Sequence, residues 1–379
     1  MKQLLINNFK CFRNIEIPIN GLTIFAGANG NGKSTAIQSL LFLRRTIEHC
    51  AKWEDGQYQM LEPGDLRVEL NGAYCMSLGT SSGIIPHSSN AKSLSLGFQH
   101  EDKAFMVDYE VEDNKLWLKP SNVKGGDTLK DDPLFYQEFY YLNAERIGPR
   151  LSQTIQFYDF PNTGFKGEFV AQLIGDAESN YSFKVDELRR NQNSKSPRLE
   201  QQVNAWLDYL MPGVVVSANY DTETGFAQIK LENKYTRGRP IISTNIGFGI
   251  SYVLPVIVTG LIARKGSYMI VENPEAHLHP SAQSKIGQFL AVIAESGVKV
   301  IVETHSDHVI NGVQIAVADK RASSNIIQTN FFDQLEGSDQ PNIEHILLND
   351  RGELSKWPHG FFDQNQVDYR SLIKLRMNG

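Results

Sequence analysis

Residues 27–34 read Gly-Ala-Asn-Gly-Asn-Gly-Lys-Ser, and Thr35 follows them. The apolar run at 22–26 predicts a strand before this loop, and apolar residues at helical spacing between 37 and 47 predict a helix after it. Glycines let backbone N–H groups approach phosphate oxygens, and the dipole at a helix N-terminus favours the negative charge. A strand, a glycine-rich loop and a helix in this order predict a binding site for the phosphates of a nucleotide.

Two side chains of the loop have chemical roles in this interpretation. Lys33 neutralises the outer phosphates, and the Ser34 hydroxyl is a ligand for Mg²⁺. We therefore expect ATP and Mg²⁺ as cofactors. The residues expected to bind the nucleotide are Gly27, Asn29, Gly30, Asn31, Gly32, Lys33, Ser34 and Thr35.

A second stretch supplies carboxylates. The apolar run Tyr268–Val271 predicts a strand that ends in Glu272, and Asn273, Pro274 and Glu275 follow. An acid at the end of a strand that lies C-terminal to the phosphate loop is what the Mg²⁺ side of such a site requires. We expect Glu272 to reach the metal and Glu275 to polarise the attacking water. A strand that ends in a solvated acidic turn is the alternative.

Two further segments are candidates. The buried strand predicted at 298–302 carries His305 to its C-terminal end, where His305 could contact the γ-phosphate or orient water. A capping or core histidine is the alternative. Residues 245–251 precede a predicted helix and suggest a second anion-binding helix start, with an ordinary turn as the alternative. Its candidate nucleotide ligands are Asn245, Gly247, Gly249 and Ser251.

Composition restricts the class of protein. The 379 residues carry a net charge of -6, which argues against a uniformly basic nucleic-acid binder. Three cysteines without metal-type spacing indicate a reducing compartment. The first residues are too polar for a signal peptide, and the longest apolar stretch, 252–263, is too short to cross a bilayer. We expect a cytoplasmic protein without a membrane role of its own.

Alternating strands and helices from residue 214 onwards predict an α/β fold with a parallel sheet. Residues 54–130 are β-rich, and 133–210 have a more helical pattern that includes a helix ending at Val185–Arg190 and a returning helix at Arg198–Leu210. We expect an ATPase lobe at 1–75, an inserted β-rich and helical region at 76–235, and a second ATPase lobe at 236–379. Basic residues at the tip of the insertion, Arg189, Arg190, Lys195 and Arg198, suggest nucleic-acid contact or a solvated helix end.

In this order the motifs resemble those of ABC/SMC-type P-loop ATPase heads, which include SMC proteins, RecF and OLD-like ATPases. The opening Leu5–Phe12 is similar to their first strand, and residues 27–35 match the Walker A motif. Residues 245–251 resemble a divergent signature motif, Val271–Pro280 resembles Walker B with the loop after it, and His305 resembles the switch histidine. The resemblance implies a mixed sheet flanked by helices, and two heads that bind ATP between the Walker A of one and the signature motif of the other.

One position departs from the family pattern. Walker B of the wider family ends in Asp-Glu, and this chain has Glu272 and Asn273 there. The amide of Asn273 cannot act as a general base, so Glu275 takes that role or hydrolysis is slow. The histidines 277, 279, 305 and 308 could alternatively form a metal cluster, although the resemblance explains them as loop and switch residues.

A narrower resemblance is carried by Tyr141–Arg150, Glu272–Pro280 and Trp357–Asp363. These stretches look like a prokaryotic subfamily of small AAA-type ATPases without coiled-coil arms, often found beside nucleases or other effectors in anti-phage operons, including Septu-like and retron-linked systems. This implies a regulatory ATPase that dimerises around nucleotide and controls an effector such as a nuclease encoded nearby. No nuclease motif of its own is visible. The alternatives are a RecF-like DNA repair ATPase that acts directly on DNA, and the nucleotide-binding subunit of a transporter.

Overall fold

The computed structural model describes the chain except residues 1, 63, 87, 88, 90, 127–130, 177–182, 237, 246, 359–363 and 378–379. A central sheet has the strand order β10-β15-β16-β3-β17-β18. Its first five strands run parallel, and β18 pairs antiparallel with β17. The strands are β3 (Leu22–Gly27), β10 (Phe139–Leu142), β15 (Tyr268–Glu272), β16 (Lys299–Glu303), β17 (Ile327–Asp333) and β18 (Asn342–Ile346).

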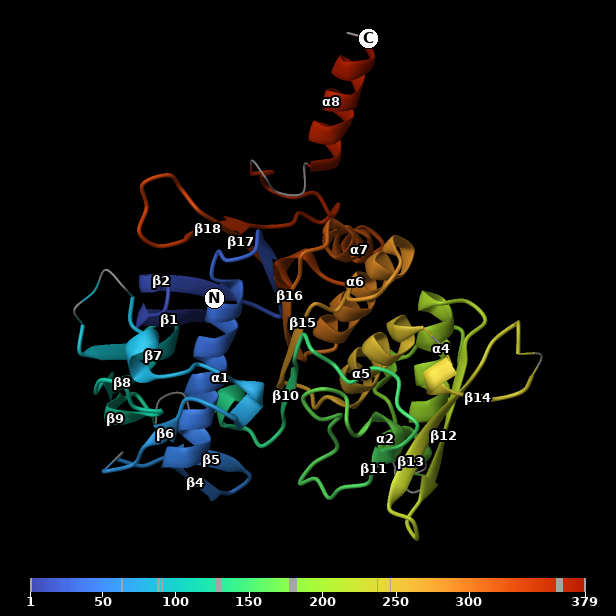
Figure 1. The fold of residues 1–379 in the computed structure, drawn as a ribbon, viewed down its shortest axis with the longest axis horizontal. Helices are drawn as coiled ribbons and strands as arrows, with labels where there is room; N and C mark the ends of the chain where they lie inside the picture. The colour runs from blue at the N-terminus through green and yellow to red at the C-terminus, as the bar shows by residue number, and fades with distance from the viewer. Residues whose placement is uncertain are drawn as a thin grey trace.

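A second sheet covers the helix that follows the glycine-rich loop. This helix, α1 (Lys33–Cys50), lies between the central sheet and an antiparallel sheet of order β2-β1-β7-β8-β9-β6, and all three share one apolar core (Figure 1). The strands are β1 (Lys2–Phe9), β2 (Phe12–Ile19), β6 (Val68–Glu69), β7 (Ser93–His100), β8 (Lys103–Glu110) and β9 (Trp117–Lys124). A hairpin of β4 (Ala51–Glu54) and β5 (Gln57–Met60) extends from the end of α1.

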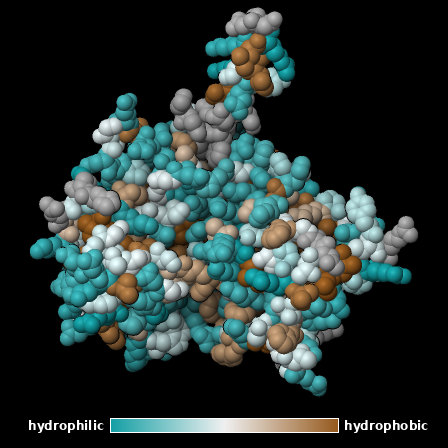
Figure 2. Space-filling view, in the orientation of Figure 1, coloured by the Kyte–Doolittle hydropathy of each residue, from teal (hydrophilic) through white to brown (hydrophobic). Residues whose placement is uncertain are grey.

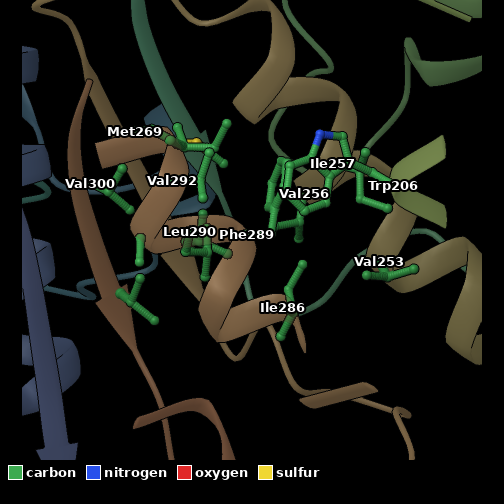
Figure 3. Close-up of a cluster of buried hydrophobic side chains, with 14 of the residues drawn as sticks. Trp206, Val253, Val256, Ile257, Met269, Ile286, Phe289, Leu290, Val292 and Val300 are labelled. Carbon is green, nitrogen blue, oxygen red and sulfur yellow. The ribbon is translucent and has the colours of Figure 1, made fainter. Parts of the chain in front are cut away.

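Helices pack on the opposite face of the central sheet. They are α4 (Leu199–Leu210), α5 (Phe248–Ile262), α6 (Pro280–Glu295) and α7 (Asp307–Ala318). Figure 3 shows their core, in which side chains from α4, α5 and α6 meet side chains from the strands β15 and β16. The labelled residues are Trp206, Val253, Val256, Ile257, Met269, Ile286, Phe289, Leu290, Val292 and Val300.

A small sheet completes this half of the molecule. Its strands follow the order β11-β13-β12, and β14 pairs with β13. They are β11 (Gln153–Thr154), β12 (Val215–Asp221), β13 (Phe226–Glu232) and β14 (Ile241–Ile242), and the short helix α2 (Val170–Gly175) lies beside them (Figure 1).

Side-chain alternation in the central strands determines which residues can reach the loop before α1. On β16, Val300 and Val302 belong to the core on the helical face, and Ile301 belongs to the core that contains α1. Successive side chains of a strand point to opposite faces, so Glu303 projects to the α1 side with Ile301. Glu272 projects to the same side, because it lies two residues after Ile270 and pairs in register with Glu303.

The α/β fold predicted from the sequence is confirmed, and so are the strands expected at 22–26, 268–271 and 298–302 and the helices expected at 37–47 and 198–210. The helix expected to end at Val185–Arg190 is wrong. The segment 185–190 contains only a 3-10 turn at Glu187–Arg189, and β10 joins the central sheet as an edge strand. The division at residues 75 and 235 stays a prediction, although β7–β9 pair into the same sheet as β1.

The C-terminal helix α8 (Gln364–Met377) projects from the body of the molecule (Figure 1). Figure 2 shows apolar and polar side chains together on its surface, and the exposed apolar residues include Val367, Leu372, Ile373 and Leu375. Among the described helices, none combines the length and apolar character that crossing a bilayer requires.

Candidate functional site

The glycine-rich loop joins the end of β3 to the start of α1 at the carboxyl edge of the parallel strands. Gly27, Gly30 and Gly32 have φ values of 133°, 84° and 96°, a region that side chains rarely adopt. A Cβ on Gly27 would lie 2.2 Å from the carbonyl oxygen of Phe332 on β17. Asn31 Nδ2 donates to the same carbonyl at 3.2 Å. The neighbouring strand therefore requires glycine at position 27 and holds the loop in place.

Lys33 and Ser34 begin α1 and point in different directions. The Lys33 ammonium donates to the carbonyls of Gly27 and Ala28 at 2.9 and 2.7 Å, so its positive charge lies within the loop. Burial lowers the pKa of Lys33, and the carboxylates of Glu303 and Glu275 oppose this shift. Ser34 Oγ donates to Glu303 Oε1 at 2.8 Å. Thr35 is buried, and Asn29 is exposed at the tip of the loop.

Glu272 ends β15 and is already hydrogen-bonded on the β10 side. Its Oε1 accepts from the Tyr141 hydroxyl at 2.8 Å. Burial raises the pKa of Glu272, while the bonds from Tyr141 and from the backbone of Ala144 oppose that shift. The guanidinium of Arg146, only 2% exposed, donates to the backbone carbonyls of Glu272 and Asn273. Arg146 thereby holds the end of β15 and the turn that follows it.

Asn273 directly follows Glu272 after β15, at the position to which the resemblance to ABC/SMC-type heads assigns a glutamate. Its φ of 46° is left-handed, and its backbone N–H donates to the Glu303 carbonyl at 2.8 Å. Its Oδ1 is buried without a hydrogen-bond partner. A side-chain amide cannot accept a proton from water, so Asn273 shapes the turn without supplying a base.

Glu275 and His305 meet beyond the strand ends. Glu275 Oε1 accepts from the backbone N–H of His305 at 2.8 Å, and its Oε2 is buried without a partner. Burial raises the pKa of the Glu275 carboxyl. Partial burial and the nearby Lys33 ammonium lower the pKa of the His305 imidazole, and a hydrogen bond with the backbone of Gly27 opposes this. These contacts bring three sequence candidates, Lys33, Glu275 and His305, into one site.

Sequence reasoning missed Glu303. It ends β16 between the strands of Glu272 and Gly27, it is only 4% exposed, and its Oε2 has no partner. Burial and the charge of Glu272 raise its pKa to about 7, and the Ser34 hydrogen bond opposes this. The signal in the sequence was an acid directly before Thr304 and His305, at the end of an otherwise apolar strand.

The donor set fits Mg²⁺. Ser34 Oγ and the Glu303 carboxylate lie within hydrogen-bond distance of each other, and one carboxylate oxygen is unsatisfied. Mg²⁺ in phosphate-transferring sites takes one or two protein oxygens and completes its shell with phosphate and water. Within the described residues, no three His, Cys, Asp or Glu side chains form a metal-binding group, and this includes the histidines considered above.

The signature-like segment lies elsewhere. Gly247 caps α5, and a Cβ on Gly249 would lie 2.8 Å from the carbonyl oxygen of His277. Ser251 lines a pocket with Gly148 and Arg150, and the side chain of Asn245 is outside the described part. Since α5 and α1 pack on opposite faces of the central sheet, the structure does not bring this segment to the glycine-rich loop of the same chain.

The basic tip suggested by the sequence is only partly present. Arg189 is 3% exposed and donates to Ser296 Oγ at 2.7 Å and to the carbonyl of Ala263. It therefore has a structural role and is not available to a nucleic acid. Lys195 and Arg198 are exposed.

Two family models match the chain. Residues 22–311 match AAA_21, described as "AAA domain, putative AbiEii toxin, Type IV TA system". Residues 323–372 match DUF3696, a protein family of unknown function.

Two curated relatives are similar over most of this chain. The OLD nuclease of Thermus scotoductus is 22% identical over 81% of the chain and 59% of the relative. The Old nuclease of Escherichia phage P2 is 20% identical over 82% of the chain and 58% of the relative. The chain thus spans less than two thirds of the length of these relatives.

Solved SMC heads share the fold. A structure of the SMC head bound to the C-terminal winged-helix domain of ScpA matches with a TM-score of 0.56 and 13% identity, over 92% of this chain and 97% of that one. An SMC head with an extended coiled coil, bound to the C-terminal domain of ScpA derived from Pyrococcus furiosus, also matches. The TM-score is 0.53 and the identity 13%, over 99% of this chain and 100% of that chain.

Proposed function

The chain belongs to the AAA_21 family and has the fold of an ABC/SMC-type P-loop ATPase head, and from this we propose that it binds ATP with Mg²⁺, hydrolyses it, and uses the cycle to control a partner effector. The observation that carries the proposal is the meeting of Lys33, Ser34, Glu303, Glu275 and His305 at the carboxyl edge of one parallel sheet. This is the edge where α/β folds bind nucleotides.

Each side chain has a chemical task in this proposal. The Lys33 ammonium and the loop N–H groups hold the phosphates, and bound Mg²⁺ neutralises charge on the transferred group. Glu275 accepts the proton of the attacking water through its unpartnered Oε2, and its raised pKa makes it a better base than an exposed carboxylate. His305, held beside Gly27, orients the outer phosphate or the water.

We propose that two copies enclose the nucleotide. The glycine-rich loop leads into α1, and α1 and α5 pack on opposite faces of the central sheet, so one chain alone does not surround ATP with both segments. In a facing pair, Gly247, Gly249 and Ser251 of one copy reach the phosphates bound by the other. Binding ATP then stabilises the dimer, and hydrolysis releases it, which makes the head a switch as well as an enzyme.

The effector in this proposal is a nuclease supplied by another chain, and its context is defence against phage in the cytoplasm. Two curated relatives are named OLD nucleases and are longer than this chain, and the description of the matched family names an AbiEii toxin and a type IV TA system. The three cysteines are free thiols, which suits a reducing compartment. Direct action on DNA, as in RecF-like repair, is less well supported because Arg189 is buried.

The ATPase part is tested by phosphate release and by mass measurement in solution, with and without ATP. We expect Lys33→Ala to abolish turnover and ATP-dependent dimerisation, and Lys103→Ala, on an exposed part of β8, to behave as wild type. Turnover by Lys33→Ala at the wild-type rate would contradict the proposal.

The regulatory part is tested by co-purifying the chain with each protein encoded beside its gene, with ATP, with ADP and without nucleotide. We expect one of these proteins to bind the chain in a nucleotide-dependent manner. We also expect the nuclease activity of that partner to change when the chain is bound. Capture of no neighbouring protein in any of the three conditions would eliminate the regulatory role and leave the ATPase assignment intact.

A further inference from the structure

Glu303 is held in place by the central sheet and faces the start of α1. Its strand, β16, pairs with β3 on one side and β15 on the other, so its end lies beside both the glycine-rich loop and Glu272. Register pairs Glu303 with Phe25 on β3 and with Glu272 on β15. The backbone therefore places one carboxylate directly between the loop and the second acidic strand end.

The contacts of Glu303 are incomplete. Oε1 accepts from Ser34 Oγ at 2.8 Å, while Oε2 is buried and has no partner. Two other carboxylates, Glu272 and Glu275, lie near enough to act on it electrostatically, and Lys33 is the cation among its neighbours. A buried charge of this kind is costly unless it is paired or bound to a metal. The arrangement suits a cation that binds next to Ser34.

Glu272, by comparison, is turned towards β10. Its Oε1 is taken by the Tyr141 hydroxyl, and Arg146 holds its backbone carbonyl. Moving this carboxylate to a metal beside Ser34 would break the Tyr141 bond. Glu303 needs no such rearrangement, because the Ser34 hydroxyl can donate its hydrogen to Oε1 while an oxygen lone pair faces a cation.

We propose that Glu303 is the principal carboxylate ligand of the nucleotide-bound Mg²⁺, together with Ser34, and that Glu272 acts only as its neighbour. This inference rests on the proposed function, since it assigns the metal side of the same ATP site. It moves the metal-binding role from the strand that resembles Walker B to the strand between it and β3.

The test measures nucleotide binding, not turnover. ATP affinity is measured by calorimetry in excess Mg²⁺ and in EDTA for wild type, Glu303→Gln, Glu272→Gln and the exposed control Glu110→Gln. Binding of Mn²⁺ in the presence of ATP is followed by electron paramagnetic resonance. We expect Glu303→Gln still to bind ATP in EDTA, and we expect the ratio of its ATP affinity in Mg²⁺ to that in EDTA to be at least tenfold smaller than the wild-type ratio, which is the enhancement by Mg²⁺. Glu272→Gln and Glu110→Gln keep most of that enhancement.

A variant that keeps the charge and a stability measurement accompany this test. Glu303→Asp keeps a carboxylate but shortens its reach, so we expect it to retain part of the enhancement. In EDTA, Glu303→Gln should melt at a higher temperature than wild type, because it removes a buried carboxylate that lies near two others and whose Oε2 has no partner. With Mg²⁺ and ATP present, wild type should melt at the higher temperature, because it binds these ligands more tightly and is therefore stabilised more by them.

The outcomes distinguish a failure of the proposed function from a failure of the role assigned to Glu303. Wild type that binds no ATP under any condition would overturn the proposed function. ATP binding whose enhancement by Mg²⁺ survives in Glu303→Gln, or is lost in Glu272→Gln to the same or a greater extent, would overturn the role of Glu303 and leave the proposed function standing.

Discussion

The backbone N–H of His305 donates a hydrogen bond to Oε1 of Glu275 across 2.8 Å. This bond joins the loop after β16 to the loop after β15, so the histidine and the acid are positioned by the same contact. It also leaves Oε2 of Glu275 as the oxygen without a partner. The two residues are 30 positions apart in the chain.

The first prediction concerns Glu275. Glu275→Gln keeps an oxygen that can accept from His305 but removes the basic carboxylate. We expect phosphate release to fall by about 100-fold or more, the scale of general base catalysis, with ATP affinity within a few-fold of wild type. Size-exclusion chromatography with light scattering should then find the variant as a dimer in ATP. Undiminished hydrolysis would remove Glu275 from the role of base.

The second prediction tests whether two chains share each ATP. Lys33→Ala and Ser251→Ala are each expected to be inactive alone. Mixed in equal amounts, they should recover up to about a quarter of wild-type phosphate release, the value for random pairing, in which half of the pairs are mixed and each mixed pair has one intact composite site. If each chain forms its site alone, the mixture stays as inactive as its components.

Arg146 is the subject of the third prediction. It donates to the carbonyls of Glu272 and Asn273, and a lysine cannot reproduce the geometry of the guanidinium. We expect Arg146→Lys to destabilise the fold by about 1–3 kcal/mol for each carbonyl left unpaired. At a temperature where the variant is folded, the rate of hydrolysis should also fall at least about tenfold, since the turn before Glu275 loses its support.

Arg189 provides the matched control for this prediction. It is buried to the same degree as Arg146, at 3% against 2% exposed, but it bonds Ser296 and Ala263, away from the site. Arg189→Lys should lower the melting temperature and leave the rate per folded molecule unchanged. Equal losses of rate in both variants would mean that Arg146 acts only through overall stability.

The fourth prediction compares two glycines of the loop. Gly27→Ala places a methyl group 2.2 Å from the Phe332 carbonyl, with φ at 133°, so we expect loss of folded protein or of all ATP binding. A Cβ on Gly30 meets nothing within 4 Å. Gly30→Ala has only its positive φ to accommodate, which costs about 1 kcal/mol. Thermal melting of the two variants compares their stabilities. Equal melting temperatures would contradict the expected clash between a Cβ at position 27 and β17.

Local patterns predicted the part of the site that is continuous in the chain. The loop 27–34, the helix after it and the acidic end of β15 are each recognisable within one short segment, because strand alternation and helical spacing are local properties. The order of the motifs also predicted the parallel sheet. The edge strand β10 was not predicted, since four apolar residues give too short a pattern to distinguish strand from helix.

Long-range packing determined the rest. Whether Arg189 lies at a basic tip or in the interior depends on contacts with residues about 70 to 107 positions away, which no local pattern encodes. Glu303 and Ser34 are 269 positions apart in the chain but share a hydrogen bond. They meet because β16 lies between β15 and β3 in the sheet. The amino-acid sequence thus specified a phosphate loop and an acidic partner strand. Which carboxylate meets the loop followed from strand order, and strand order is set by the burial of apolar faces over the whole domain.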